Sequence, residues 1–219
     1  MATTDELRQL AAQLAHPNGE AGSRLAKMME ETNYTMTLQA LDALSVKAGD
    51  YVLEIGHGSA SHVKSFLDQH PDVQYAGLEI SGSMHQLATQ VNQASITAGR
   101  ADFRLYDGQE FPYSPASFSG ILSVNTIYFI PDPTTFIAQI SELLQPNGKL
   151  TLTFAKKSFM KTLPFTAYGF RLYDEEEVLR FADPHLLAFE STIQGREIVL
   201  SKNGDQVERE FLTIVWNKI

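Results

Sequence analysis

The sequence of 219 residues contains no cysteine. This absence excludes disulfides, thiolate zinc sites, iron–sulfur clusters and cysteine nucleophiles. No apolar run reaches the roughly 18 residues that a membrane span requires, and the polar segment 1–14 has no apolar signal-peptide core. We therefore expect a cytoplasmic protein that does not associate with a membrane.

Positive charge is also scarce. The chain has 17 Lys and Arg against 26 Asp and Glu, a formal net charge of −9. Nucleic-acid binding draws much of its free energy from basic side chains on phosphates, so this balance predicts no nucleic-acid partner. The six histidines are scattered without the spacing of metal ligands, which predicts no metal site. A small molecule is the expected partner.

The residues that are present indicate one folded domain. Hydrophobic residues make up 43% of the chain, and no repeat, Pro-rich linker or low-complexity block divides it. We expect a single domain over 1–219 with four parts: an N-terminal helical cap at 1–48, a core at 50–155, a lid and helix at 156–185, and a C-terminal β-hairpin at 186–219.

The spacing of apolar residues predicts an alternation of strands and helices after two N-terminal helices. Helices are expected at 3–15, 22–46, from about 59 to 69, and at 82–95, 134–144 and 174–181. Strands are expected at 51–55, 73–79, 102–106, 120–124, 149–154, 186–200 and 206–216. This order is typical of an α/β fold, a doubly wound Rossmann-like seven-stranded sheet that is mostly parallel and ends in an antiparallel hairpin. The tetrapeptide 202–205, Lys-Asn-Gly-Asp, predicts the hairpin turn.

The first predicted strand leads into a glycine-rich turn, Gly56-His57-Gly58. Such a turn lets the backbone approach a ligand closely and opens a helix whose N–H groups attract negative charge. Glu79 ends the second strand, 21 positions beyond Gly58, where a carboxylate can bind both hydroxyls of a ribose. Asp107 follows the third strand, so acids end consecutive strands at the edge where α/β sheets bind ligands.

With these residues the chain resembles the class I S-adenosylmethionine-dependent methyltransferases, in their small-molecule branch. The resemblance covers residues 17–155 and includes the motif Glu54-Ile55-Gly56-His57-Gly58 and the segment 123–129. It implies S-adenosylmethionine as cofactor and S-adenosylhomocysteine as product. By this resemblance the cofactor-binding residues are Glu54, Gly56, His57, Gly58, Glu79, Ile80, Met84, Asp107, Gly108, Gln109, Asn125 and Thr126. Ala60 departs from the glycine common in the family, and His57 from an apolar residue or cysteine.

The expected function is methyl transfer to a small-molecule acceptor. If the acceptor must lose a proton, His57 and Tyr128 are the nearest candidate bases by motif position. An aromatic cluster within 159–173 fits either an acceptor lid or ordinary packing. The candidate substrate pocket comprises Tyr34, Tyr128, Phe165, Tyr168 and Phe170.

Two other functions fit the same fold. A nicotinamide-dependent oxidoreductase would use Gly56-x-Gly58-x-x-Ser61 and Glu79 for NAD(P), although Ser61 replaces the usual third glycine and no Tyr-x-x-x-Lys pair is present. A non-catalytic module on this fold is the third interpretation.

Overall fold

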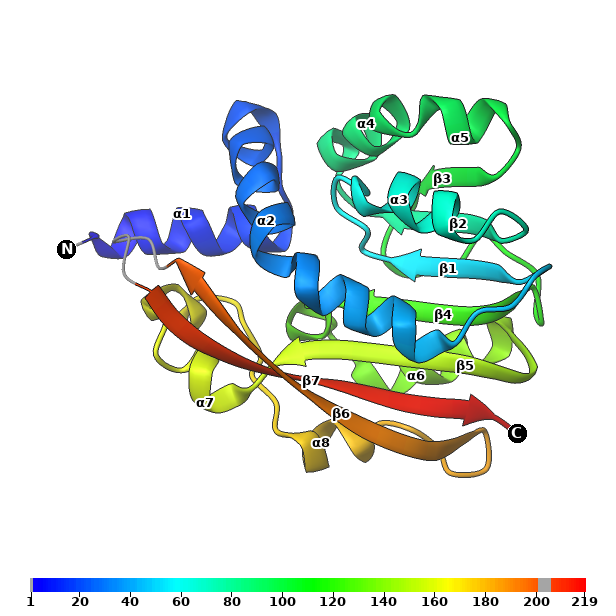
Figure 1. Ribbon diagram of the computed structural model, residues 1–219. Helices are drawn as coiled ribbons and strands as arrows, with labels where there is room; N and C mark the ends of the chain where they lie inside the picture. Colours follow the sequence, from blue (N-terminus) through cyan, green and yellow to red (C-terminus); the bar gives the residue numbers. More distant parts are fainter. Residues whose placement is uncertain (1, 201–205) are drawn as a thin grey trace.

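The computed structural model describes residues 2–200 and 206–219, and its centre is one seven-stranded sheet (Figure 1). The strands are β1 (Tyr51–Ile55), β2 (Gln74–Glu79), β3 (Ala101–Leu105), β4 (Phe118–Val124), β5 (Leu144–Ala155), β6 (Leu187–Leu200) and β7 (Gln206–Lys218). Their order across the sheet is β3-β2-β1-β4-β5-β7-β6. The first five pair in parallel, and β7 runs antiparallel to both neighbours. The predicted fold class is confirmed.

Helical segments surround this sheet. The α-helices are α1 (Thr4–Ala15), α2 (Gly19–Leu44), α3 (His62–Gln69), α4 (Gly82–Val91), α5 (Gln93–Thr97), α6 (Pro133–Leu143), α7 (Lys157–Met160) and α8 (Glu175–Leu179), and the 3₁₀ turns are η1 (Ile127–Phe129) and η2 (Pro164–Ala167). Within the described residues, no helix is long and apolar enough to cross a membrane. Helix α2 packs across β4, β5 and β7, and α1 contacts α2 and η2. Figure 1 shows α2 bending in its middle as it passes the sheet.

Local sequence explains where several helices begin. Thr3 caps α1 through a reciprocal pair of hydrogen bonds with Glu6. Asp132 caps α6 by accepting the N–H of Thr135 at 3.2 Å, and Pro133 supplies the fixed φ angle of the first helical residue. Large buried side chains of the sheet, including Trp216 and Phe154 on one face, then fill the core.

Several predicted ends shift by one to three residues, and two predicted elements differ more from the structure. The helix expected at 82–95 is two helices, because Asn92 is buried and its amide donates to the carbonyl oxygens of Ala60 and Ala88, at 2.9 and 3.1 Å, in competition with helical bonding. The strand expected at 149–154 begins at Leu144, and the turn around the left-handed Asn147 (φ 63°) is absorbed as an irregularity opposite β4. The predicted hairpin turn at 202–205 lies outside the described residues.

Candidate functional site

A cavity of about 370 Å³ opens where the parallel strands end, between the strand ends and the N-terminal helices. All twelve residues that the sequence predicts for the cofactor line this cavity: Glu54, Gly56, His57, Gly58, Glu79, Ile80, Met84, Asp107, Gly108, Gln109, Asn125 and Thr126. They come from β1, β2, α4 and the loops after β1, β3 and β4. The parallel arrangement therefore gathers residues that lie far apart in the sequence.

The glycine turn after β1 has a conformation that its residues require. Gly56 and Gly58 have φ angles of 78° and 57°, in the left-handed region that glycine enters without strain. A Cβ atom on Gly56 would overlap the methyl carbon of Thr126 from the loop after β4. The turn thus lies directly against Thr126, and no larger residue fits at position 56.

Glu79, the last residue of the neighbouring strand β2, hydrogen-bonds the glycine turn. One carboxylate oxygen accepts the N–H of Gly58 at 3.0 Å, and the other accepts those of Ile80 and Ser81, at 2.9 and 3.0 Å. Burial raises the pKa of Glu79, and these three backbone bonds only partly offset that effect. The carboxylate is held rigidly at the cavity wall with lone pairs left for a ligand.

Asp107 lies in the exposed loop after β3. Its Oδ1 accepts the N–H groups of Gln109 and Glu110 at 2.8 and 2.9 Å, and these bonds lower the pKa of its carboxyl group. The acid thus stays ionised while it shapes the loop, and its other oxygen accepts from no other residue in the part of the chain that the structure describes.

Glu54, at the end of β1, is almost fully buried behind the turn. Its Oε2 lies 2.7 Å from Nε2 of His62 and accepts the hydroxyl of Tyr75. Burial alone raises the pKa of Glu54, but attraction to His62 and the hydrogen bonds from His62 and Tyr75 outweigh it, and the pKa is lowered. His62 also lines the cavity, which the sequence did not indicate.

His57 lines the cavity, but its ring packs over the sheet. The ring contacts Phe103, with centroids 4.9 Å apart, and a Cβ on Gly77 of β2 would lie 2.5 Å from its Cδ2. Nδ1 lies 2.9 Å from the carbonyl oxygen of Gly58, which can only accept, so Nδ1 carries the proton. Burial lowers the pKa of His57 to about 4. Its buried Nε2 has no partner, and this packing does not favour His57 as a base.

Tyr128 is not among the residues that line the cavity, and its assignment to the substrate pocket and as a candidate base stays a prediction. Its buried hydroxyl accepts the N–H of Ala155 at 2.7 Å and lies 3.1 Å from Asn125 Oδ1. Burial raises its pKa above the ordinary value for tyrosine. Tyr128 instead braces the loop after β4 against the end of β5.

The aromatic segment after β5 also lies outside the cavity lining. Phe170 packs against Tyr128 and Phe165, with ring centroids 5.8 and 5.6 Å away, and Tyr168 stacks with the guanidinium of Arg8 on α1 at 5.4 Å. Of the five residues predicted for the substrate pocket, the cavity lining includes only Tyr34. The segment packs against η1 and α1, and the substrate-pocket role of Phe165, Tyr168 and Phe170 stays a prediction.

Helix α2 supplies the cavity wall that the sequence did not predict. Met29, Glu30, Asn33 and Thr37 line the cavity beside Tyr34. Ser59 Oγ donates to a carboxylate oxygen of Glu30 at 3.1 Å and so ties α2 to the glycine turn. A contact between segments this far apart leaves no periodic signal in the sequence.

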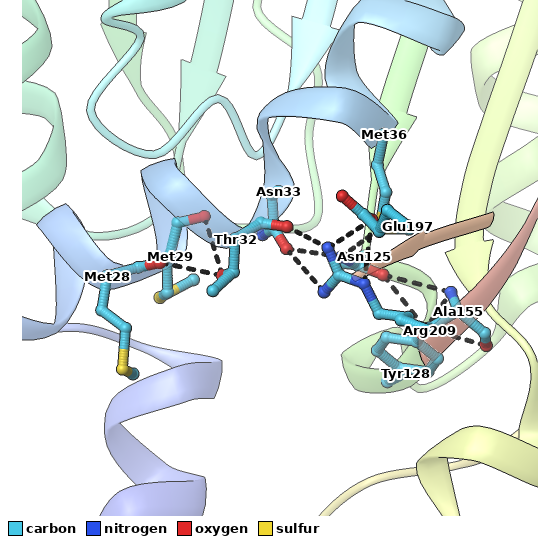
Figure 2. Close-up of polar contacts among 10 residues, drawn as sticks. All are labelled: Met28, Met29, Thr32, Asn33, Met36, Asn125, Tyr128, Ala155, Glu197 and Arg209. Atoms are coloured by element: carbon cyan, nitrogen blue, oxygen red, sulfur yellow. Dashed lines mark hydrogen bonds and ion pairs between the residues drawn. The ribbon is translucent and has the colours of Figure 1, made fainter. Parts of the chain in front are cut away.

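A hydrogen-bonded network ties the same part of α2 to the loop after β4 and to the C-terminal hairpin (Figure 2). Asn125 Nδ2 donates to Asn33 Oδ1 at 3.0 Å. Arg209 on β7 reaches Asn33 Oδ1 at 3.5 Å, donates to the carbonyl of Thr32, and forms an ion pair with Glu197 of β6 at 2.7 Å. The cavity wall is therefore held from behind by the last two strands.

The charge of the cavity suits a cationic ligand. Four carboxylates line it, Glu30, Glu54, Glu79 and Asp107, and the described lining includes no Lys or Arg. Carboxylates bind hydroxyls and amines, and the glycine turn admits a ligand against the backbone. These residues fit a nucleoside that carries a sulfonium. In residues 2–200 and 206–219, no group of three or more His, Asp and Glu side chains could hold a metal ion.

Comparisons with known proteins agree with this geometry. Residues 53–152 match the family described as the methyltransferase domain. An O-methyltransferase of Pyrenophora dematioidea is 26% identical over 117 residues, 53% of this chain and 43% of that protein. The 27-O-demethylrifamycin SV methyltransferase of Amycolatopsis mediterranei is 28% identical over 124 residues, 57% of this chain and 45% of that enzyme. The chain spans about half the length of the relatives it matches.

A solved structure shares the whole fold. It is the putative methyltransferase in a complex with the Haloferax volcanii Trm112 methyltransferase activator, and it superposes with a TM-score of 0.74 over 99% of both chains at 17% identity. The fold that the resemblance to class I methyltransferases implies is thus confirmed.

Proposed function

We propose that this chain, which carries a class I S-adenosylmethionine-dependent methyltransferase domain, transfers a methyl group from S-adenosylmethionine to an oxygen of a small organic acceptor. The observation that carries the proposal is the meeting of Glu54, Glu79 and Asp107 around one glycine turn in one cavity. The relatives that are O-methyltransferases support oxygen as the acceptor atom.

Each part of the cavity has a role in this proposal. Glu79 binds the ribose hydroxyls, because its carboxylate is fixed by three backbone bonds and retains free lone pairs. Asp107, with Gly108 and Gln109, faces the adenine, and Ile80 and Met84 pack beside it. Gly56, Gly58 and Thr126 surround the methionine portion. Glu54 contributes negative charge behind the turn.

The bound sulfonium supplies an activated methyl group. The protein then has to align the acceptor with it and exclude water, an orientation effect worth several kcal/mol. In this proposal helix α2 and the loop after β4 serve this purpose, and the support is that both line the cavity. No covalent intermediate with the protein is required.

Calorimetric titration of the purified chain tests the proposal. S-adenosylhomocysteine, NADH and NADPH are titrated in parallel, since cofactor identity separates methyl transfer from nicotinamide chemistry before any acceptor is known. We expect micromolar binding of S-adenosylhomocysteine and no binding of the nicotinamides. Binding of a nicotinamide instead would establish an oxidoreductase, and binding of none of the three would indicate a module without cofactor.

A further inference from the structure

The buried guanidinium of Arg209 is the starting point. Its side chain is only 9% exposed, and it leaves β7 to reach the middle of α2. Nε and Nη2 both donate to Glu197 Oε1, at 3.0 and 2.7 Å, which neutralises the charge. The remaining donors go to the Thr32 carbonyl and to Asn33 Oδ1. Arg209 therefore hydrogen-bonds α2, and it is not among the residues that line the cavity.

These contacts determine how the two neighbouring amides are oriented. A guanidinium can only donate, so Asn33 must turn its amide oxygen toward Arg209. The amide of Asn125 is oriented by its oxygen, because Oδ1 accepts the hydroxyl of Tyr128 at 3.1 Å and the N–H of Ala155 at 3.4 Å. Its nitrogen then faces Asn33, at 3.0 Å. Figure 2 shows the oxygen of Asn33 between Asn125 and Arg209.

This arrangement leaves the amide nitrogen of Asn33 without a hydrogen-bond partner among the described residues. All contacts of the Asn33 amide with described residues run through its oxygen, so its nitrogen keeps two donors. Asn33 lines the cavity and is partly exposed. It lies at the end formed by Asn125 and Thr126, which adjoin Gly56. This end is opposite the loop of Asp107, because β3 and β4 are separated by two strands.

We propose that Asn33 binds the α-carboxylate of the methyl donor through its amide nitrogen, and that Arg209 is the positioning residue that holds Asn33 in this orientation. The described lining has no Lys or Arg that could bind a carboxylate by its charge. Asn33 supplies a neutral donor for it at the methionine end. The assignment rests on the proposed function.

The test compares two ligands that differ in the amino-acid portion. S-adenosylhomocysteine carries the α-carboxylate, and 5′-methylthioadenosine lacks the whole amino-acid group. In Asn33→Asp an oxygen replaces the donor without a change of shape. We expect its affinity for S-adenosylhomocysteine to fall at least about tenfold, as for a lost hydrogen bond to a charged group, with an unchanged affinity for 5′-methylthioadenosine.

Arg209 is tested in the same way with a matched control. Arg209→Met should lower the ratio of the two affinities, and Arg209→Lys, which can still donate to Asn33, should restore part of it. Arg196→Met removes an exposed arginine of the same hairpin that pairs with Glu208 and Glu210, and should leave the ratio unchanged. A purely structural defect would weaken both ligands together, so the ratio separates orientation from folding.

The outcomes are distinct. An unchanged ratio in Asn33→Asp overturns the binding role of Asn33 even if Arg209→Met fails to fold. An unchanged ratio in a folded Arg209→Met overturns the positioning role. If the wild-type chain binds neither ligand, the proposed function fails, and this inference fails with it.

Discussion

At the scale of single residues, the buried ring of His57 makes stability depend on pH. Its pKa is lowered to about 4 by burial, whereas in the unfolded chain it is about 6.5. Between these values the unfolded chain binds a proton that the folded chain does not, so stability falls as the pH falls through this window and levels off below it.

We therefore expect the titration of His57 to lower the free energy of unfolding by about 2 kcal/mol when the pH falls from 7.5 to 5. His57→Gln removes the titrating group and should make the unfolding free energy less dependent on pH by that amount. Denaturant unfolding of both proteins at the two pH values measures this difference. Equal pH dependence in the two proteins would show that the ring is protonated in the folded state.

Glu79 offers the sharpest test of the cofactor assignment. Glu79→Gln keeps one oxygen, for the N–H groups of Ile80 and Ser81, but it places an amide nitrogen opposite the N–H of Gly58 and removes the charge. S-adenosylhomocysteine should therefore bind about 1–3 kcal/mol more weakly while the fold is retained. Glu110→Gln, on an exposed carboxylate outside the cavity lining, is the control and should bind normally. Calorimetry gives both affinities. Normal binding by Glu79→Gln would remove the ribose role.

The residues that could be predicted from sequence share one property. Glu54, Glu79 and Asp107 follow or end consecutive strands, and parallel strands end at one edge of a sheet, so local order alone brings them together. No such rule predicts the contact of Arg209 with Asn33, which joins positions 176 residues apart. Tyr128 is buried outside the cavity lining, which its sequence motif could not indicate, because an aromatic residue in a motif fits the core as well as a pocket.

At the scale of elements, Gly195 determines how the two C-terminal strands pair. It lies opposite Phe211 in the register of β6 and β7, and a Cβ at position 195 would overlap that buried ring. We expect Gly195→Ala to lower the unfolding free energy by about 1–3 kcal/mol through overpacking. Gly82→Ala, in open space at the start of α4, should change it little. Thermal unfolding compares the two, and equal melting temperatures would contradict the packing argument.

The elements themselves were predictable because apolar runs and helical spacing are local patterns. The breaks and extensions of these elements could not be predicted. The break at Asn92 depends on a hydrogen bond to Ala60, 32 residues earlier in the chain. The extension of β5 to Leu144 depends on pairing with Phe118 of β4. Both are tertiary contacts that propensity does not contain.

At the scale of the whole molecule, negative charge surrounds the cavity. The chain has a net charge of −9, and the described cavity lining has four carboxylates and no Lys or Arg. S-adenosylmethionine carries one net positive charge and S-adenosylhomocysteine none, so attraction favours the cofactor over its product at low ionic strength. Salt screens this attraction.

We expect S-adenosylmethionine to lose affinity severalfold relative to S-adenosylhomocysteine when the salt concentration rises from about 10 mM to about 1 M. Parallel titrations of both ligands at each concentration give the ratio. The neutral ligand controls for general effects of salt on the fold. A ratio that does not change would mean that the carboxylates are neutralised when the ligand binds.

The packing of His57 over Gly77 and Phe103 also constrains how related sequences can vary. A Cβ atom at position 77 would lie 2.5 Å from Cδ2 of His57 and 2.7 Å from Cδ1 of Phe103, so the two rings occupy the space that a side chain there would need. Among homologues of this chain, a larger residue at 77 should therefore accompany a smaller one at 57 or 103. The central residue of the glycine turn would then covary with the second strand, independently of which acceptor each enzyme methylates.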